Sequence, residues 1–251
     1  MRISTGLFTM QRVARQQTQN IALKASASRR KGLFITCEGI EGSGKSTQAR
    51  ALARYLQSKG WQVLETREPG GTPVGEWIRE MFLRPDRNWY ATDPFTPECE
   101  VALMLAARSQ HVANQLLPAL QQGAIVICDR FSDSTLAYQG FGRGIPLPVL
   151  QRLIRWATRG LTPDVTFLFD LPVSRGLQRR WHDADRLDRE PAAFHQRVRK
   201  GFLALAQQHT RRIHTINADR SPRTISQRLI TLLEPLLTDG LRTRRLVIKR
   251  L

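Results

Sequence analysis

The sequence has few cysteines, and none of them stands in a metal-binding or disulfide pattern. Only three occur in 251 residues, Cys37, Cys99 and Cys128, and no two of them form a Cys-x-x-Cys pair. Two of the three stand in apolar runs that we expect to be buried strands. This usage excludes a disulfide framework and gives no support for a zinc site.

Long hydrophobic runs are also absent. No apolar stretch approaches the roughly 20 residues that a helix needs to span a bilayer, so we expect no membrane segment. Hydrophobic residues make up 41% of the chain and charged residues 24%, which is typical of a soluble cytoplasmic enzyme. The length allows one sizeable core, or one core with a small lid.

Acidic residues are scarce relative to basic ones, 21 against 39, giving a formal charge of +18. Seven basic residues precede Glu38, the first acidic residue, and five follow Asp239, the last. We therefore interpret 1–31 and 240–251 as solvated basic arms around one domain at 32–239. Without the arms, the domain keeps a smaller excess of positive charge, which suits an enzyme that binds two polyanionic nucleotides.

The arms support only nonspecific contact with nucleic acid, since neither contains a recognition pattern. The N-terminal arm lacks acidic residues and is rich in Arg, Gln and Ser, so it also resembles an organelle transit peptide. A misassigned start codon and a simple disordered extension are equally consistent with it.

A complete phosphate-binding loop occurs near the start of the domain, between the apolar run Leu33 to Cys37 and the helical pattern Thr47 to Ser58. Its glycines let backbone N–H groups curl around a phosphate, Lys45 reaches the β and γ oxygens, and Ser46 is placed to ligate Mg²⁺. The loop predicts a nucleoside triphosphate site. The expected ATP-binding residues are Gly39, Ile40, Glu41, Gly42, Ser43, Gly44, Lys45, Ser46 and Thr47.

Short apolar runs alternate with amphipathic helical patterns along the domain. This alternation predicts an α/β fold, a five-stranded parallel sheet with helices on both faces, as in P-loop NTPases, and a small helical lid. The expected strands are Leu33 to Cys37, Gln62 to Glu65, Ile125 to Cys128, Val165 to Phe169 and Ile213 to Ile216. The expected helices are Thr47 to Ser58, Pro97 to Gln122, Leu147 to Ala157, Phe194 to His209 and Pro222 to Leu237.

Two further polar motifs follow strands, where ligands bind in such sheets. Arg67, in the motif Thr66 to Thr72, can bind a phosphate through two hydrogen bonds. The Pro-Gly-Gly sequence of the same motif is also typical of a simple turn, which is the alternative. Asp129 stands where an acidic group steadies Mg²⁺, and Arg130 can face a transferring phosphoryl group; a structural ion pair is the alternative. In the same motif, Thr135 and Gln139 lie one helical turn apart and share a face.

From about Gly32 to Leu237, the chain resembles the bacterial thymidylate kinases in the content and the order of its motifs. These motifs are the ones described above together with Ala106-Ala107-Arg108 and Pro163-Asp164-Val165. The resemblance implies transfer of the γ-phosphoryl of ATP to thymidine 5′-monophosphate with Mg²⁺, for dTTP and DNA synthesis, by a homodimer. It implies catalytic roles for Lys45 and Arg130, and metal contacts from Ser46 and Asp129.

The resemblance also implies which residues bind the acceptor. Glu41 would reach the 3′-hydroxyl and Arg67 the phosphate, while three polar side chains would read thymine: Arg108, Thr135 and Gln139. Met104 stands where the family often has an aromatic ring that stacks on thymine. Methionine can pack on a ring face, and ordinary core filling is the alternative.

The lid, about 178–191, departs from the family by its shortness and by lacking a glycine before Asp185-Arg186. Because the phosphate loop has no arginine, the chain resembles the subgroup whose catalytic arginine comes from the lid. Arg179 and Arg186 match arginine positions of the family, whereas Arg189 does not. A charged helix face is the alternative for this segment.

Two other functions fit part of the pattern. Another phosphate-loop kinase would share the fold and the donor site, and the residues Arg108, Thr135 and Gln139 argue against it. A DNA-associated ATPase has only the basic arms in its favour, since no helicase-like motor segments follow the third strand.

Overall fold

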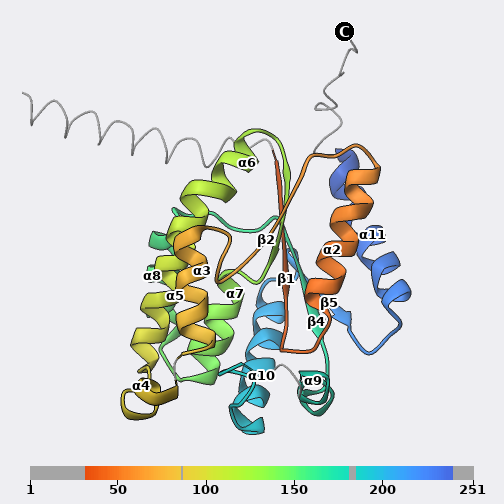
Figure 1. The fold of residues 1–251 in the computed structure, drawn as a ribbon. Coiled ribbons are helices and arrows are strands. Elements are labelled where there is room, and N and C mark those ends of the chain that lie inside the picture. Colours follow the sequence, from red (N-terminus) through yellow and green to blue (C-terminus); the bar gives the residue numbers. More distant parts are fainter. Residues whose placement is uncertain (1–31, 86, 181–184, 240–251) are drawn as a thin grey trace, which may run out of the picture.

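The computed structural model describes residues 32–85, 87–180 and 185–239 (Figure 1). One parallel sheet of five strands lies at its centre, in the order β2-β3-β1-β4-β5. The strands are β1 (Leu33–Glu38), β2 (Val63–Arg67), β3 (Ile125–Asp129), β4 (Val165–Asp170) and β5 (Ile213–Asn217). The predicted sheet is confirmed. The predicted arms, 1–31 and 240–251, and part of the predicted lid, 181–184, lie outside the described residues.

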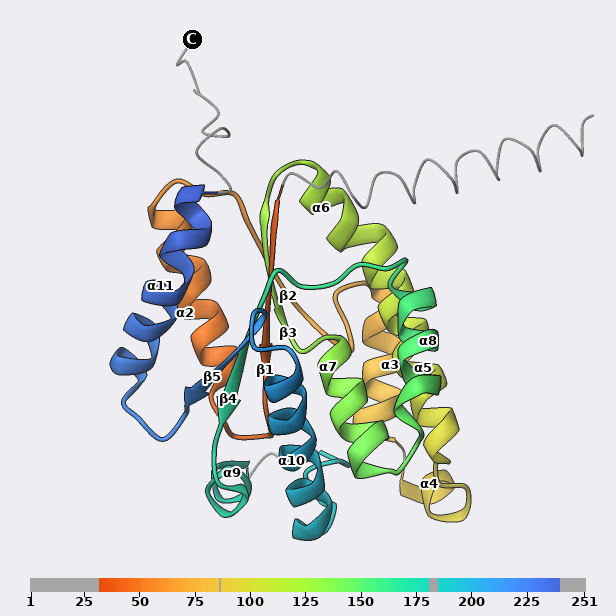
Figure 2. The same ribbon diagram turned by 180° about the vertical axis from the view of Figure 1, so that it is seen from behind.

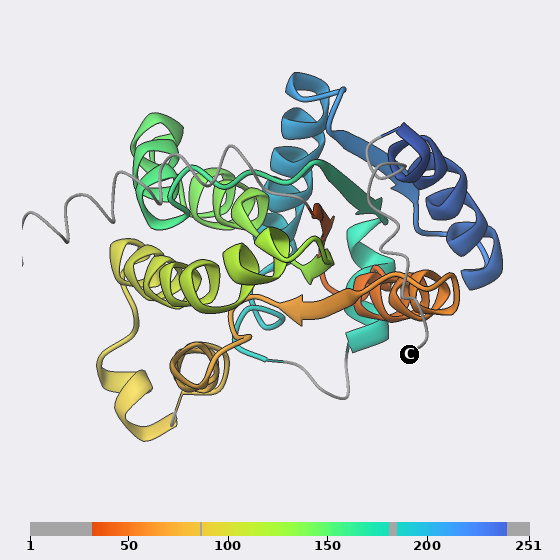
Figure 3. The same ribbon diagram turned by 90° about the horizontal axis from the view of Figure 1, so that it is seen from above.

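Helices cover both faces of the sheet (Figures 2 and 3). The helices α2 and α11 pack on one face, and the others that cover the sheet lie on the opposite face, with α5 between α3 and α8. Their bounds are α2 (Lys45–Ser58), α3 (Pro73–Leu83), α4 (Arg87–Thr92), α5 (Pro97–His111), α6 (Leu117–Gln121), α7 (Ser132–Thr135), α8 (Leu147–Ala157), α9 (Val173–Arg180), α10 (Ala192–Gln208) and α11 (Pro222–Asp239). In the described residues, no helix is long and apolar enough to cross a membrane.

The central strands are buried on both faces, which is why their sequences are almost continuously apolar. The threonines in this layer are paired: the hydroxyls of Thr36 and Thr166 lie 2.7 Å apart across β1 and β4. Cys37 and Cys128 are buried in β1 and β3, and burial raises the pKa of both thiols, whereas Cys99 on α5 is exposed.

All the predicted helices are present. The long one, Pro97 to Gln122, is α5 and α6 joined through a π-helical segment, η1 (Val112–Leu116). The π-helical segment ends just before Pro118, which has no N–H to continue the α-helical hydrogen bonds. A second π-helical segment, η2 (Leu136–Gly142), follows α7 and contains Tyr138 and Gln139.

Helix α3 is not among the predicted helices, although the sequence marks its start. Thr72 is the N-cap, its hydroxyl accepts from the N–H of Gly75 at 3.1 Å, and Pro73 occupies the first turn. Threonine followed by proline is a typical helix start. The helix presents Glu76 and Arg79 beside the β2 end of the sheet, so this cap helps position polar residues of the site.

Replacing the cap tests its contribution. Thr72→Ala should lower the free energy of unfolding by about 1 kcal/mol, because the buried N–H of Gly75 loses its acceptor. Thr72→Ser keeps the acceptor and serves as the control. Equal thermal midpoints for the Ala and Ser variants would mean that the hydroxyl does not stabilise α3.

Candidate active site at the carboxyl ends of the strands

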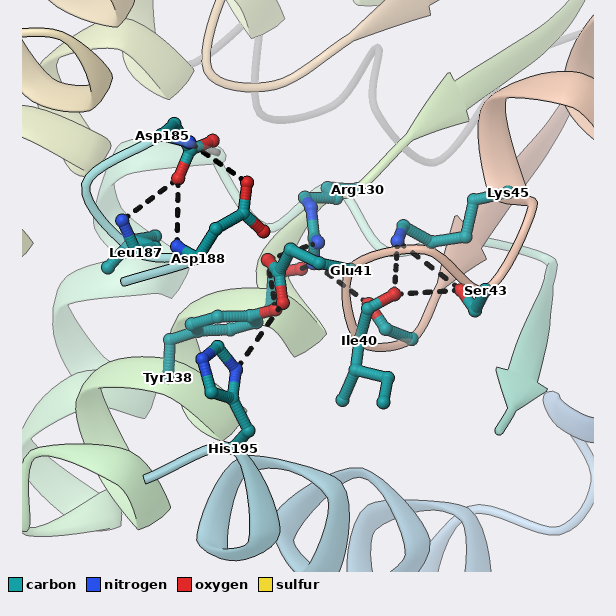
Figure 4. Close-up of polar contacts among 12 residues, drawn as sticks. Ile40, Glu41, Ser43, Lys45, Arg130, Tyr138, Asp185, Leu187, Asp188 and His195 are labelled. Carbon is teal, nitrogen blue, oxygen red and sulfur yellow. Dashed lines mark hydrogen bonds and ion pairs between the residues drawn. The ribbon is translucent and has the colours of Figure 1, made fainter. Parts of the chain in front are cut away.

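The loop between β1 and α2 wraps around the head of Lys45. The glycines Gly39, Gly42 and Gly44 have positive φ angles of 140°, 69° and 85°, which let the backbone curl before α2 begins. Lys45 Nζ donates to the carbonyl of Ile40 at 2.7 Å (Figure 4). Burial, followed by the charge of Arg130, lowers the pKa of Lys45 to about 8.

Helix α9 lies against this loop. A Cβ at Gly42 would come within 2.3 Å of the carbonyl oxygen of Gly176, and one at Gly176 within 2.6 Å of the carbonyl oxygen of Glu41. Glycines at both positions therefore allow a backbone-to-backbone approach. This approach brings Arg179 to the loop, where its Nη1 donates to the carbonyl of Gly42 at 3.2 Å.

Ser46 and Asp129 meet at the mouth of the loop, from the first turn of α2 and the end of β3. The hydroxyl of Ser46 donates to Asp129 Oδ2. The other carboxylate oxygen, Oδ1, is buried and has no hydrogen-bond partner among the described residues. A buried carboxylate oxygen without a donor is poised for a ligand that supplies positive charge.

Arg130 connects the phosphate loop with the rest of the site. Its φ of 71° is unusual for a residue with a side chain. The guanidinium donates to the carbonyl of Gly39 at 3.0 Å, to Ser134 Oγ at 3.1 Å and to Glu41 Oε1 at 2.8 Å, and it lies over the ring of Tyr138. Strain at this residue is thus held in place by three hydrogen bonds.

The charges around Arg130 support one another. Burial alone would lower the pKa of Arg130, but Tyr138, Glu41 and Asp129 outweigh it and raise the pKa. Burial alone would raise the pKa of Glu41, but Arg130 and Lys45 lower it. Glu41 Oε2 lies 3.7 Å from Nδ1 of the buried His195 on α10 (Figure 4). The raised pKa of Arg130 and the lowered pKa of Glu41 keep these two side chains charged at neutral pH.

One cavity of about 910 Å³ extends from the phosphate loop to a second cluster of polar side chains. Most of the predicted site residues line it, namely Glu41, Gly42, Gly44, Lys45, Ser46, Thr47, Arg67, Met104, Arg108, Asp129, Arg130, Thr135, Gln139 and Arg179. The predicted residues Gly39, Ile40, Ser43 and Arg186 do not line it.

The second cluster contains both polar and apolar groups. Arg67 is half-exposed and pairs with Glu76 at 2.9 Å. Arg108 is buried and donates to Thr135 Oγ1 at 2.9 Å. Met104 lines the cavity and also packs in the core, so the two interpretations of this residue are compatible. Phe82 is a further apolar wall.

Arg186 lies elsewhere than Arg179. Its guanidinium stacks on Phe82, with 4.3 Å from Cζ to the ring centroid, and also lies over Tyr90 and Phe95. Nη1 donates to Glu100 at 2.7 Å. These contacts hold Arg186 between α3 and α5, whereas Arg179 reaches the phosphate loop.

Several residues of the site were not among the sequence-based candidates. Arg79, Tyr138 and Glu68 line the cavity, and His195 and Glu100 stand behind residues that do. Tyr138 and Glu68 belong to the two polar motifs that follow β3 and β2, so their place in these motifs is a sequence signal for a role in the site. Arg79 required recognition of α3, and Glu100 reaches the site only through long-range packing.

The strand, glycine-rich loop and helix, together with Asp129-Arg130 and a cavity reaching a second polar cluster, define a P-loop nucleotide kinase. The sequence profile of the family described as thymidylate kinase matches residues 37–229. The chain belongs to the thymidylate kinase family, and the predicted family, fold and enzyme class are confirmed.

Individual relatives agree with the profile. A thymidylate kinase of Carboxydothermus hydrogenoformans is 48% identical over 208 residues, covering 82% of this chain and 98% of that protein. A thymidylate kinase of an Exiguobacterium species is 46% identical over 201 residues, and the match covers 79% of this chain and 92% of that protein. The crystal structure of the thymidylate kinase from Ehrlichia chaffeensis superposes with a TM-score of 0.65 at 33% identity, covering 81% of this chain and 98% of that one.

Proposed function

We propose that this chain transfers the γ-phosphoryl group of ATP to thymidine 5′-monophosphate, giving the diphosphate for dTTP and DNA synthesis in the cytoplasm. The observation that carries the proposal is a continuous cavity that is lined at one end by the phosphate loop and at the other by Arg108, Thr135 and Gln139. A kinase must hold two nucleotides in one space with the reacting atoms about 3 to 3.5 Å apart. The cavity supplies such a space.

The donor end binds the phosphates of ATP. Backbone N–H groups from Gly42 to Thr47 surround the phosphates, and Lys45 leaves its intramolecular acceptor, the carbonyl of Ile40, for the β and γ oxygens. Little covalent chemistry is required, because positioning and neutralisation of charge account for most of phosphoryl transfer. Lys45 is therefore the central donor-side residue.

Ser46 and Asp129 fit a Mg²⁺ ion. Both offer hard oxygen atoms, and Mg²⁺ binds through one or two such groups with phosphate oxygens and water completing its shell. The unpartnered Oδ1 of Asp129 supports this assignment. A Mg²⁺ ion held there would supply positive charge that neutralises the phosphate oxygens. The hydroxyl of Ser46 and the carboxylate of Asp129 orient that site.

Arg130 and Arg179 supply positive charge near the group in transfer. Arg130 lies between the loop and the acceptor cluster, and Arg179 contacts the loop at Gly42. The contacts of Arg186 favour anchoring of the segment after α9 over direct action on ATP. Arg179 is therefore our candidate for the catalytic lid arginine, in preference to Arg186.

The acceptor end binds the monophosphate. Arg67 contacts its phosphate and Glu41 its 3′-hydroxyl, since Glu41 Oε2 has no hydrogen-bond partner among the described residues. Met104 and Phe82 pack on the base. Arg108, Thr135 and Gln139 read its polar edge; a buried donor left unpaired by a wrong base would cost about 1 to 3 kcal/mol.

Assays of a panel of nucleoside monophosphates with ATP and Mg²⁺ test the function. Thymidine monophosphate should give the highest kcat/KM. A higher value for another monophosphate would assign the chain to a different nucleotide kinase. Tight, salt-dependent binding to duplex DNA without kinase activity would support the DNA-associated alternative.

We further propose that the chain is a homodimer. Helices α3 and α8 each expose an apolar row, Val74, Trp77 and Met81 on one and Val149, Leu153 and Trp156 on the other. Trp77 is 80% and Trp156 77% exposed, and both helices flank α5 on the side of the sheet opposite α2 (Figure 3). Large exposed apolar groups gathered on one layer are typical of a protein interface.

Charge placed in these rows should prevent association. Trp77→Glu and Trp156→Glu are each expected to shift the protein to monomer, because a buried unpaired carboxylate is costly. Arg54→Glu, at an exposed position of α2 on the opposite side of the sheet, is the control and should remain a dimer. Sedimentation velocity measures the mass. A parent protein that is monomeric at all concentrations would contradict the homodimer.

Loss of the lysine charge should abolish the activity. Lys45→Ala is expected to retain less than about a tenth of the turnover rate, since a missing charge on the donor phosphates costs several kcal/mol in the transition state. Circular dichroism should show an unchanged fold, and a coupled ADP assay measures the rate. Lys59→Ala, at the far end of the same helix, is the control. A nearly normal rate for Lys45→Ala would refute the donor-site assignment.

The lid arginines can be ranked by single substitutions. Arg179→Ala should lower kcat by about 10² with little change in either KM, because the charge acts on the transition state. Arg186→Ala should lower the thermal midpoint of unfolding, because the variant loses the contacts of the guanidinium with three aromatic rings. Arg189→Ala should behave as the parent.

Two other outcomes would assign the catalytic arginine differently. A folded Arg186→Ala variant with a similar 10² loss, beside a normal Arg179→Ala, would transfer the catalytic role to Arg186. Normal turnover of all three variants would leave Arg130 as the arginine that neutralises the transferring group.

A further inference from the structure

Two buried carboxylates support side chains that face the acceptor end of the cavity, and one of them, Glu68, also borders the cavity. Glu68, just after β2, is 4% exposed, and Glu100, on α5, is 1% exposed. Neither belongs to the groups assigned above to ATP, to Mg²⁺ or to thymidine monophosphate. Each one, however, holds a polar side chain that contacts the base in the proposed function. Their contacts show what they can do.

Glu68 fixes the guanidinium of Arg108. Its Oε2 accepts from Arg108 Nε at 2.6 Å, while the two terminal nitrogens of Arg108 donate to Thr135 Oγ1 and to the carbonyl of Phe131. All three nitrogens of the guanidinium are thus held, so the group has little freedom to rotate. Since arginine has no acceptor atom, it presents only donors to the cavity.

Glu68 is held in turn by a buried histidine. Its second oxygen, Oε1, lies 3.0 Å from His111 Nδ1, and His111 Nε2 lies 2.8 Å from Thr66 Oγ1. The chain of contacts joins the end of β2 to α5 and α7. A carboxylate with partners on both oxygens is a rigid support for Arg108.

Glu100 fixes the amide of Gln139. Glu100 Oε2 accepts from Gln139 Nε2 at 3.1 Å, and the carboxylate also accepts from Arg143 at 2.9 Å and from Arg186 at 2.7 Å. Burial alone would raise the pKa of Glu100, but Arg143 and Arg186 outweigh burial and lower it. Glu100 is therefore ionised and can only accept hydrogen bonds.

An acceptor-only partner determines the orientation of the amide. Only the NH₂ group of Gln139 can face Glu100, so its carbonyl oxygen is the end that is left for a ligand. A flipped amide would place two oxygen atoms against each other in a buried site. The acceptor end of the cavity thus carries a fixed donor, Arg108, and a fixed acceptor, Gln139.

We propose that Glu68 and Glu100 are positioning residues that set this donor and acceptor, and that they thereby select thymine over cytosine. Thymine has an acceptor at O4 beside a donor at N3, which complements the pair. Cytosine has a donor amino group at that corner beside an unprotonated N3, so both contacts are reversed. Uracil has the same pattern as thymine. The inference rests on the proposed function, since it deepens the recognition of the same acceptor.

Substitution of Glu100 gives the main test. Glu100→Gln can donate or accept, so it releases the amide of Gln139 to rotate. The measurement is kcat/KM for the monophosphates of thymidine, deoxyuridine and deoxycytidine at saturating ATP. The thymidine-to-deoxycytidine ratio should fall at least about tenfold, while the thymidine-to-deoxyuridine ratio and the KM for ATP stay within about twofold. If Glu100 had a purely structural role, the substitution would lower kcat/KM for all three monophosphates by a similar factor.

Glu190→Gln is the matched control. Glu190 accepts from the same Arg143, at 2.5 Å, but does not contact Gln139. The Glu190→Gln variant removes a charge from the same network, and its thymidine-to-deoxycytidine ratio of kcat/KM should stay within about twofold of that of the parent protein. Should Glu100→Gln not fold, Glu100→Asp keeps the charge for the arginines while withdrawing from Gln139, and it should show the same loss of selectivity.

Glu68→Gln tests the donor half independently. It should lower kcat/KM for thymidine monophosphate more than for deoxycytidine monophosphate, because the support of Arg108 is weakened. Folded Glu100 and Glu68 variants that keep the parent ratio would overturn the proposal, as would an equal loss in Glu190→Gln. A parent that does not prefer thymidine monophosphate would instead refute the proposed function, so the two failures are distinguishable.

Discussion

The parallel pairing of β1 with β3 is the constraint on which the site depends. The register sets Cys37 opposite Asp129, so the phosphate loop that follows β1 and the Asp129-Arg130 pair that ends β3 emerge side by side. Glu38, at the end of β1, is wholly buried and accepts from the N–H of Phe131 and from Ser134. Burial, followed by the charge of Asp133, raises the pKa of Glu38 to about 7. One strand end therefore fixes both the loop and the segment that faces it.

Much of the fold could be predicted because it follows from local patterns. The three central strands, β1, β3 and β4, are short and nearly continuous apolar runs, as burial on both faces requires. The phosphate loop is contiguous, so Lys45 and Ser46 could be given roles from their spacing alone. Helix α3 was missed although Thr72 and Pro73 mark its start, because a Pro-Gly-Gly turn drew the interpretation toward a loop.

The rest of the site depends on contacts between distant parts of the chain. Arg179 and Arg186 are seven residues apart and looked equivalent in the sequence. One approaches Gly42 because two glycines permit α9 to touch the loop, and the other stacks on the rings of α3 and its neighbours. Likewise, Glu100 meets Gln139 and Arg186 only through packing of α5 against η2 and the segment before α10. No local pattern encodes such partners.

The contrast among the three cysteines has a practical consequence. Cys37 and Cys128 are sealed in the central strands, and their raised pKa values keep them as unreactive thiols, whereas Cys99 is exposed. A maleimide dye should therefore label the folded protein at one position. That position is next to Glu100 in the sequence, on the helix that also carries Met104 and Arg108. The native chain thus carries a built-in attachment point for a fluorescent reporter of acceptor binding.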